Sequence, residues 1–345
     1  MISLKDLVCY LEPALDKHNA HSGLPNQEKE KTNASEYDRG HIFYAVQEFA
    51  SNCCNERVKH AYFYGLHQKL LRACLNKDKH LAGHFLSRLE NNHIVKNESE
   101  NLLSRHTLES IINPSVAYYY YTVGNDPAKA ASYLTASLEN IDYLIEAGFK
   151  DGMYMKIEQY LNSFRVAISS GNLADAASYA KDVTVYLLSA EKEKFEFPFA
   201  EVLRSPAQLK AILEMYMNAI IFKTLGNPLL EEHVKESLLL SVFSNDPINY
   251  NTNVEHELKT ALAVFSSFLV KADPEMLSEE AIASVLAAKV PSSVQYYMLT
   301  RLLENTSEEL LPDNTSLFKV EEYCRKVLQL NNNQMMRLLP TKIKA

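Results

Sequence analysis

Two segments of helical periodicity meet at Gly171-Asn-Leu-Ala-Asp-Ala-Ala-Ser-Tyr179, and this stretch decides the fold. On both sides of it, apolar residues recur at intervals of three and four. That spacing forms one apolar stripe on a helix of 3.6 residues per turn. Gly171 favours the left-handed backbone conformation that commonly ends a helix. The stretch therefore predicts two helices, over residues 151–169 and 173–193, joined by a tight turn.

A related pattern occurs earlier in the chain. Gly124-Asn-Asp-Pro-Ala-Lys-Ala-Ala-Ser-Tyr133 contains the core Ala-Ala-Ser-Tyr, which recurs 46 residues later at 176–179. A third Gly-Asn pair, Gly226-Asn227, also lies between two segments of helical periodicity. We therefore expect a repeated helix–turn–helix unit.

The rest of the chain is also helical in pattern, because sustained alternation of apolar and polar residues is absent. Residues that favour the start of a helix support this pattern. Ser205 precedes Pro206 and lies three residues before Gln208, as in a capping box with proline at the first helical position. We expect an all-α protein with a polar loop at 17–37. Further helices are predicted at 3–12, 38–54, 56–76, 78–92, 100–112, 114–123, 127–147, 206–225, 228–244, 252–271, 278–289, 292–305 and 316–331.

Glycine is scarce, and its scarcity excludes several function classes. The chain has 9 glycines in 345 residues, where average usage would give about 24. Neither a G-x-G nor a G-x-x-x-x-G-K sequence is present. These sequences form the glycine-rich phosphate-binding loops of dinucleotide-binding proteins and P-loop nucleotidases. Both classes are therefore excluded, and low glycine also argues against a turn-rich all-β fold.

Charge is distributed unevenly along the chain. Residues 1–110 carry 14 basic and 14 acidic side chains, whereas residues 111–345 carry 21 basic and 29 acidic ones. An acidic body repels nucleic acid, since such binding depends on Lys and Arg neutralising phosphates. Charge and repeat pattern together divide the chain into an N-terminal helical region at 1–110, helical-hairpin repeats at 111–250, and C-terminal helices with a short basic tail at 251–345.

The sequence also indicates a soluble, cytoplasmic protein. Lys5, Asp6 and Glu12 interrupt the region where a signal peptide would be apolar, and no run of 18 apolar residues exists. The cysteine count is 5, an odd number without regular spacing, which favours free thiols in a reducing compartment. We therefore expect no membrane partner.

The segment Ser170–Lys181 resembles the middle of a tetratricopeptide repeat. In that family a glycine ends the first helix and a small residue in the second helix allows close approach; Ala176 and Ala130 match that small position. The resemblance covers residues 114–244 and is loose, because the family repeats every ~34 residues and this chain has no tryptophan. It implies a tetratricopeptide-like α-solenoid, or helical array, of stacked antiparallel hairpins.

The resemblance also implies a function in protein or peptide binding, as an adaptor, regulator or inhibitor. In the family, the first helix of each pair lines a concave wall; here those helices would be 114–123, 151–169 and 206–225. Tyrosine suits such surfaces because it offers apolar area with a polar tip. An acidic wall further predicts a basic partner. The candidate partner-binding residues are Tyr118, Tyr121, Tyr154, Tyr160, Asn162, Tyr216 and Asn218.

Two other functions stay open. Nine of the 11 histidines lie within residues 1–106. This concentration is compatible with an α-helical enzyme, or with a small-ligand or metal site, in the N-terminal half. The metal candidates are the pairs His80 and His84, and Glu90 and His93, but each pair lacks the further ligands that zinc or di-iron sites need. We therefore predict no metal, no cofactor and no catalytic residue. The acidic body also admits a bacterial immunity protein that neutralises a basic toxin.

Overall fold

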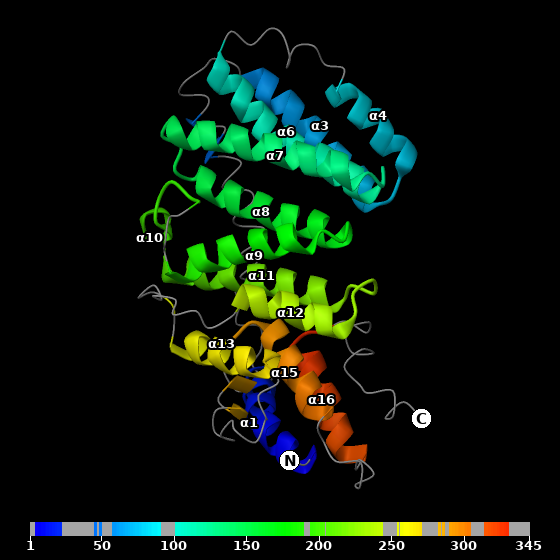
Figure 1. Ribbon diagram of the computed structural model, residues 1–345, viewed down its shortest axis with the longest axis vertical. Coiled ribbons are helices and arrows are strands. Elements are labelled where there is room, and N and C mark those ends of the chain that lie inside the picture. Colours follow the sequence, from blue (N-terminus) through cyan, green and yellow to red (C-terminus); the bar gives the residue numbers. More distant parts are fainter. Residues whose placement is uncertain are drawn as a thin grey trace. The chain divides into compact units, whose positions relative to one another are not determined.

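The computed structural model describes residues 4–22, 45–46, 48–49, 57–90, 101–189, 194–203, 205–243, 254, 256–270, 282–283, 285–286, 290–304 and 314–330. All regular elements in this part of the chain are α-helices, which make up 84% of it, so the expectation of an all-α fold is confirmed (Figure 1). None of these helices has both the length and the apolar content needed to cross a membrane. Internal contacts divide the chain into two compact units, one formed by residues 32–204 and one by residues 1–31 with 205–345.

The continuous unit, residues 32–204, is a succession of helices in which each packs on its neighbour. Its helices are α3 (Arg57–Leu75), α4 (Lys79–Glu90), α6 (Leu102–Thr122), α7 (Pro127–Glu146), α8 (Gly152–Ser169), α9 (Leu173–Ser189) and the short α10 (Phe199–Val202). α3 packs on both α4 and α6, α6 on α7, α7 on α8, and α8 on α9. The last three helix pairs can be followed in order in Figure 1.

The discontinuous unit joins the N-terminal helix to the C-terminal half of the chain. Its helices are α1 (Leu4–Ser22), α11 (Pro206–Leu225), α12 (Glu232–Phe243), α13 (His256–Leu269), α15 (Ser292–Glu304) and α16 (Asn314–Lys326). α1 packs on α16, where the Lys319 ammonium donates to the Glu12 carboxylate. α11 packs on α12 and α15, and α13 on α12 and α15. The division of the chain into segments 1–110, 111–250 and 251–345 stays a prediction. It depends on charge and on the repeat pattern, whereas the two units are defined by internal contacts.

The turn at Gly171 forms as the sequence predicts. α8 ends at Ser169, α9 begins at Leu173, and Gly171 has φ of +79°, a conformation that favours glycine. The earlier Gly-Asn turn differs, because its left-handed residue is Asn125, with φ of +53°. The two matched sequences therefore both end a helix but do so with different backbone conformations.

The structure corrects several predicted boundaries. α6 runs without interruption through Pro114, where the sequence predicts a break between 100–112 and 114–123. α1 extends through Pro13 to residue 22, beyond the predicted end at 12 and into the predicted loop, because Leu15 continues its buried apolar stripe. α10 is a helix that the sequence analysis missed. The predicted helices at 38–54 and 278–289, and the rest of the loop, fall mostly outside the described residues.

Candidate functional site

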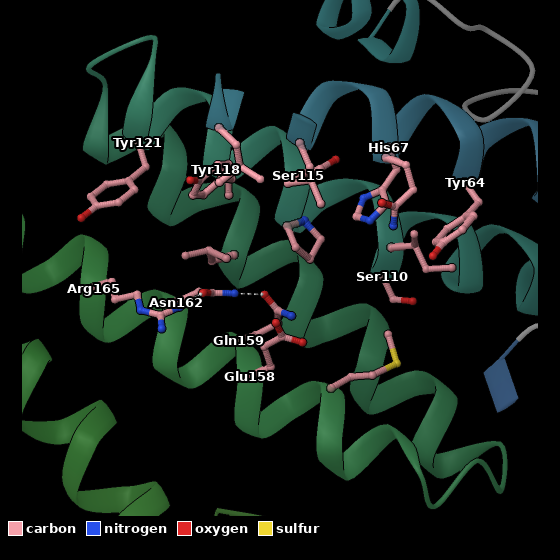
Figure 2. Close-up of a pocket in the computed structure, with 18 of the residues that line it drawn as sticks. Tyr64, His67, Ser110, Ser115, Tyr118, Tyr121, Glu158, Gln159, Asn162 and Arg165 are labelled. Carbon is pink, nitrogen blue, oxygen red and sulfur yellow. Dashed lines mark hydrogen bonds between the residues drawn. The ribbon is translucent and has the colours of Figure 1, made fainter. Parts of the chain in front are cut away.

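A cleft of about 920 Å³ opens between α3, α6 and α8 in the continuous unit (Figure 2). α7 packs on both α6 and α8, and its Leu134 also lines the cleft. Apart from Val46, the remaining lining side chains come from the faces of α3, α6 and α8 that point toward one another. The packing of α3 on α6, and of both α6 and α8 on α7, therefore forms the cleft.

Tyrosines supply much of the aromatic surface of this cleft. Tyr64 comes from α3, whereas Tyr118 and Tyr121 come from the last turns of α6. The Tyr121 hydroxyl lies 3.0 Å from the Ser169 hydroxyl, so this pair ties the end of α6 to the end of α8. Burial raises the pKa of Tyr118, and the nearby positive charge of Arg165 works in the opposite direction. Tyr118 is therefore a neutral phenol that can both donate and accept hydrogen bonds.

A row of polar side chains on α8 lies across the cleft from these tyrosines. Gln159, Asn162 and Arg165 are spaced by three residues, so they lie on one face of the helix. The Asn162 amide donates to Gln159 Oε1 at 3.1 Å, and Arg165 Nη1 donates to Asn162 Oδ1 at 3.0 Å. Each side chain thus orients the next, and the row presents fixed amide and guanidinium groups to the cleft (Figure 2).

His67 on α3 is the most unusual titratable group in the cleft. Burial lowers its pKa from 6.5 to about 4, although a hydrogen bond to the backbone of Ile111 works in the opposite direction. Its ring stacks on Tyr64 with centroids 5.6 Å apart. Its Nδ1 atom is buried and has no hydrogen-bond partner among the described residues. The imidazole is therefore neutral near pH 7 and has one nitrogen that is not satisfied.

The lining of the cleft has a positive net charge, whereas the whole chain has a negative one. Among the described residues that line it, Lys69, Arg72 and Arg165 are cationic and Glu158 is anionic. The sequence predicts an acidic wall from the excess of carboxylates after residue 110. This cleft has a net positive lining, because two of its cations come from α3, which precedes that acidic region.

The predicted partner-binding residues of this unit fall into two groups. Tyr118, Tyr121 and Asn162 line the cleft. Tyr154 is 6% exposed, and its hydroxyl donates to the Val202 carbonyl at 2.9 Å. Tyr160 packs between the rings of Tyr179 and Phe195, and burial raises its pKa to about 12. Tyr154 is therefore buried, whereas Tyr160 is only half-buried, and neither residue lines the cleft.

The other two predicted residues belong to the discontinuous unit. Tyr216 is 1% exposed, in the core of that unit. The Asn218 side chain accepts a hydrogen bond from the Ser293 backbone at 2.9 Å, which holds the start of α15 against α11. Their positions in the sequence matched the first helix of a third pair, but neither residue lines the cleft between α3, α6 and α8.

Sequence reasoning missed His67, Gln159 and Arg165. A local signal existed for the last two, because they lie three residues on either side of Asn162, which was singled out. No local signal existed for His67, since its burial depends on Tyr64 and on α6.

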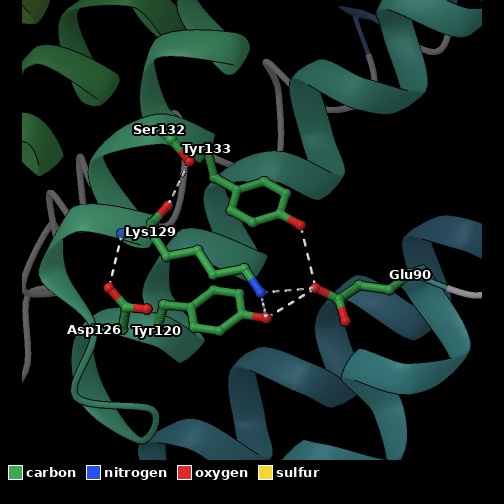
Figure 3. Close-up of polar contacts among 6 residues, drawn as sticks. All are labelled: Glu90, Tyr120, Asp126, Lys129, Ser132 and Tyr133. Atoms are coloured by element: carbon green, nitrogen blue, oxygen red, sulfur yellow. Dashed lines mark hydrogen bonds and ion pairs between the residues drawn. The ribbon is translucent and has the colours of Figure 1, made fainter.

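The predicted metal candidates lie outside the cleft. His80 and His84 are exposed on α4. Glu90 Oε1 accepts hydrogen bonds from the Tyr120 and Tyr133 hydroxyls, at 2.9 and 3.1 Å, and so links α4 to α6 and α7 (Figure 3). No group of three or more His, Cys, Asp or Glu side chains in the described part of the chain could hold a metal ion. His93 falls outside the described residues.

Comparison with protein-family models, with curated proteins and with solved structures gives no significant match. The resemblance to tetratricopeptide repeats therefore stays a prediction.

Proposed function

We propose that this chain binds a short, extended segment of a protein or peptide in the cleft between α3, α6 and α8. The observation that carries the proposal is the row of Gln159, Asn162 and Arg165, which lies across an open cleft from Tyr118 and Tyr121. This arrangement combines fixed polar groups on one wall with aromatic surface on the other.

The chemistry of the two walls suits a peptide backbone. An extended peptide presents N–H and C=O groups alternately, and amide side chains such as Asn162 and Gln159 can pair with both kinds of group. Tyrosines contribute large contact areas and lose little conformational entropy when they are bound. Polar wall and aromatic wall together would therefore hold a backbone and bury the apolar side chains beside it.

The order of the helices supports the same proposal. In tetratricopeptide-like arrays the first helix of each pair lines the binding surface. In this unit α3, α6 and α8 precede α4, α7 and α9 in three consecutive pairs, and α3, α6 and α8 contribute most of the lining. We propose on this ground that the unit is a tetratricopeptide-like array and that its cleft corresponds to the concave wall.

A second candidate function is the binding of a small amphiphilic molecule. The cleft volume of about 920 Å³ lies within the range of small-molecule sites, about 300–1,000 Å³. His67, which lines the cleft, lies in the histidine-rich N-terminal half, for which the sequence analysis left a small-ligand site open. The two candidates share one site, so one experiment can separate them.

The experiment selects random peptides on the purified chain by phage display and measures the affinity of enriched sequences by calorimetry. We expect convergence on related peptides, and a loss of about tenfold in affinity (about 1.4 kcal/mol) in the Asn162→Ala variant. Asn76→Ala is the control, because Asn76 is exposed in the turn after α3 and does not line the cleft. Failure to enrich any peptide, or affinity that does not change in Asn162→Ala, would contradict the proposal. Saturable binding of small amphiphiles without peptide binding would favour the second candidate.

A further inference from the structure

The α3 wall of the cleft carries positive charge that α3 itself does not neutralise. Lys69 and Arg72 line the cleft, and both are exposed. α3 contains no Asp or Glu, and within the described part of the chain neither of these two cations forms an ion pair. Because they are three residues apart, they lie on one side of the helix. The α3 wall therefore presents two adjacent cations to solvent.

The charged groups of the other walls do not cancel this charge. α6 contains one carboxylate, that of Glu109, and Arg105 of the same helix pairs with it at 2.9 Å. On α8, Glu158 and Arg165 both line the cleft and have opposite signs. The described lining residues thus include three cations and one anion, and the excess of two positive charges comes from α3.

Apolar side chains lie on α3 beside these cations. Leu71 and Leu75 also line the cleft, and they are four residues apart, so they are neighbours on the helix surface. Leu75 is 68% exposed and Leu71 is half-buried. Covering such apolar surface stabilises a complex. α3 therefore offers positive charge and apolar contact area side by side.

We propose that the cleft selects acidic segments, whose Asp or Glu side chains lie against Lys69 and Arg72. Apolar side chains of the same segment cover Leu71 and Leu75. This inference rests on the proposed function and adds to it the class of peptide. It gives the partner the opposite charge from the one expected from the acidic chain as a whole.

The local charge of the cleft outweighs the net charge of the chain for two physical reasons. A cleft focuses the field of the charges that line it, so two cations there attract an anionic segment more strongly than on a flat surface. Carboxylates elsewhere on the surface are screened beyond about 8 Å at physiological ionic strength. The segment in the cleft therefore experiences mainly the lining charges.

The test compares three pools of decapeptides with acetylated and amidated ends, so that the peptide termini carry no charge. All pools have the same mixture of Leu, Ile and Phe at alternate positions. The remaining positions carry Asp and Glu in one pool, Asn and Gln in the second, and Lys and Arg in the third. We expect the wild-type chain to retain the acidic pool most strongly and the basic pool least, and calorimetry then measures the affinity of the best acidic peptide.

Variants of the two cations test where the preference arises. Lys69→Gln and Arg72→Gln should each weaken binding of the acidic peptide about threefold, and the double variant about tenfold. Both positions are exposed, so we expect the fold to persist, and circular dichroism checks it. The double reversal Lys69→Glu with Arg72→Glu should transfer the preference to the basic pool, which loss of the fold could not do.

The control removes the same charge from outside the cleft. Lys79 and Arg88 are exposed on α4 and do not line the cleft, so Lys79→Gln with Arg88→Gln should keep the affinity of the wild-type chain. Raising salt from about 50 to about 500 mM shortens the range of charge interactions. It should therefore weaken binding more for the wild-type chain than for Lys69→Gln with Arg72→Gln.

The outcomes separate this inference from the proposed function. If no pool is retained, the proposed function is wrong, and this inference with it. If the neutral or the basic pool is retained as strongly as the acidic one, the acidic preference is wrong and peptide binding stands. Equal losses in the cleft and control double variants would also overturn the preference, because the charge of the whole chain would then be responsible. Displacement of the acidic peptide by an equal concentration of single-stranded oligothymidylate would overturn it too, since the cleft would then bind polyanions in general.

Discussion

The hydroxyl of Ser137 on α7 donates a hydrogen bond, 3.4 Å long, to the backbone carbonyl of Ser110 on α6. That carbonyl would normally accept from the backbone N–H of residue 114, but residue 114 is a proline and has none. A side chain of the neighbouring helix α7 therefore satisfies the carbonyl of α6 that Pro114 leaves without its usual donor.

Replacing Ser137 by alanine should destabilise the protein through this carbonyl. We expect a loss of about 1 kcal/mol in the free energy of unfolding, because a buried acceptor is left without a partner. In a Pro114→Ala background the backbone N–H is restored, so the same change should cost less. Urea denaturation of the four proteins in this double-mutant cycle measures the coupling, and equal costs in both backgrounds would refute the explanation.

Replacing Ala130 by leucine should also destabilise the protein. Ala130 is fully buried on α7 and packs in one cluster with Ala117 of α6 and Val166 of α8. A leucine there overpacks the contact of three helices, and we expect a cost of about 1–3 kcal/mol. Ala131→Leu is the control, because Ala131 is exposed on the same helix. Equal denaturation midpoints for the two variants would show that Ala130 is not at a tight contact.

Stability should depend on pH through His67. Burial lowers its pKa to about 4 in the folded state, whereas the unfolded value is 6.5. The unfolded state therefore binds more protons between these values, and stability from this group is complete above about pH 6.5 and is lost as the pH falls toward 4. The loss is at most about 3 kcal/mol. Urea denaturation from pH 4.5 to 7.5 should give a flatter profile for His67→Phe than for His84→Phe, and parallel profiles would contradict the assignment.

The ion pair between Lys156 and Asp142 should contribute more than exposed pairs do. The Lys156 side chain is 9% exposed, and its ammonium lies 2.6 Å from an Asp142 oxygen and above the Phe195 ring. Asp142→Ala leaves a buried cation without its partner, so we expect a loss of about 1–3 kcal/mol. Glu109→Ala removes the partner of the exposed Arg105 as a control and should cost under about 1 kcal/mol. Thermal denaturation compares the two, and the double variant Asp142→Ala with Lys156→Met should recover part of the loss.

The sequence predicts the parts of the fold that depend on local interactions. The turn at Gly171 follows from one glycine and the periodicity on both sides, and both are visible without tertiary structure. The break predicted at Pro114 is wrong because the Ser137 side chain of α7 bonds the carbonyl that the proline leaves without a donor, and this contact exists only after α6 and α7 have packed. The early end predicted for α1 is wrong for a similar reason, since Leu15 is buried by packing within its unit.

The candidate site was less predictable than the fold. Tyr118, Tyr121 and Asn162 lie on helices that the repeat pattern identified, and they line the cleft. The same pattern also selected Tyr154, because helical periodicity does not distinguish a tyrosine that lines a groove from one that is packed in the interior. The burial of His67 could not be predicted, because it arises only when α3, α6 and Tyr64 are in place.

The packing of α1 on α16 has a consequence for synthesis of the protein. The contact between Glu12 and Lys319 joins residues 307 positions apart, so α1 leaves the ribosome long before its packing partner exists. At translation rates of about 5–20 residues per second, the delay is roughly 15–60 s. During that time the continuous unit can fold on the growing chain, while the apolar stripe of α1 stays exposed. A chaperone that recognises apolar helices should therefore bind nascent chains at α1 and be released only after α16 has emerged.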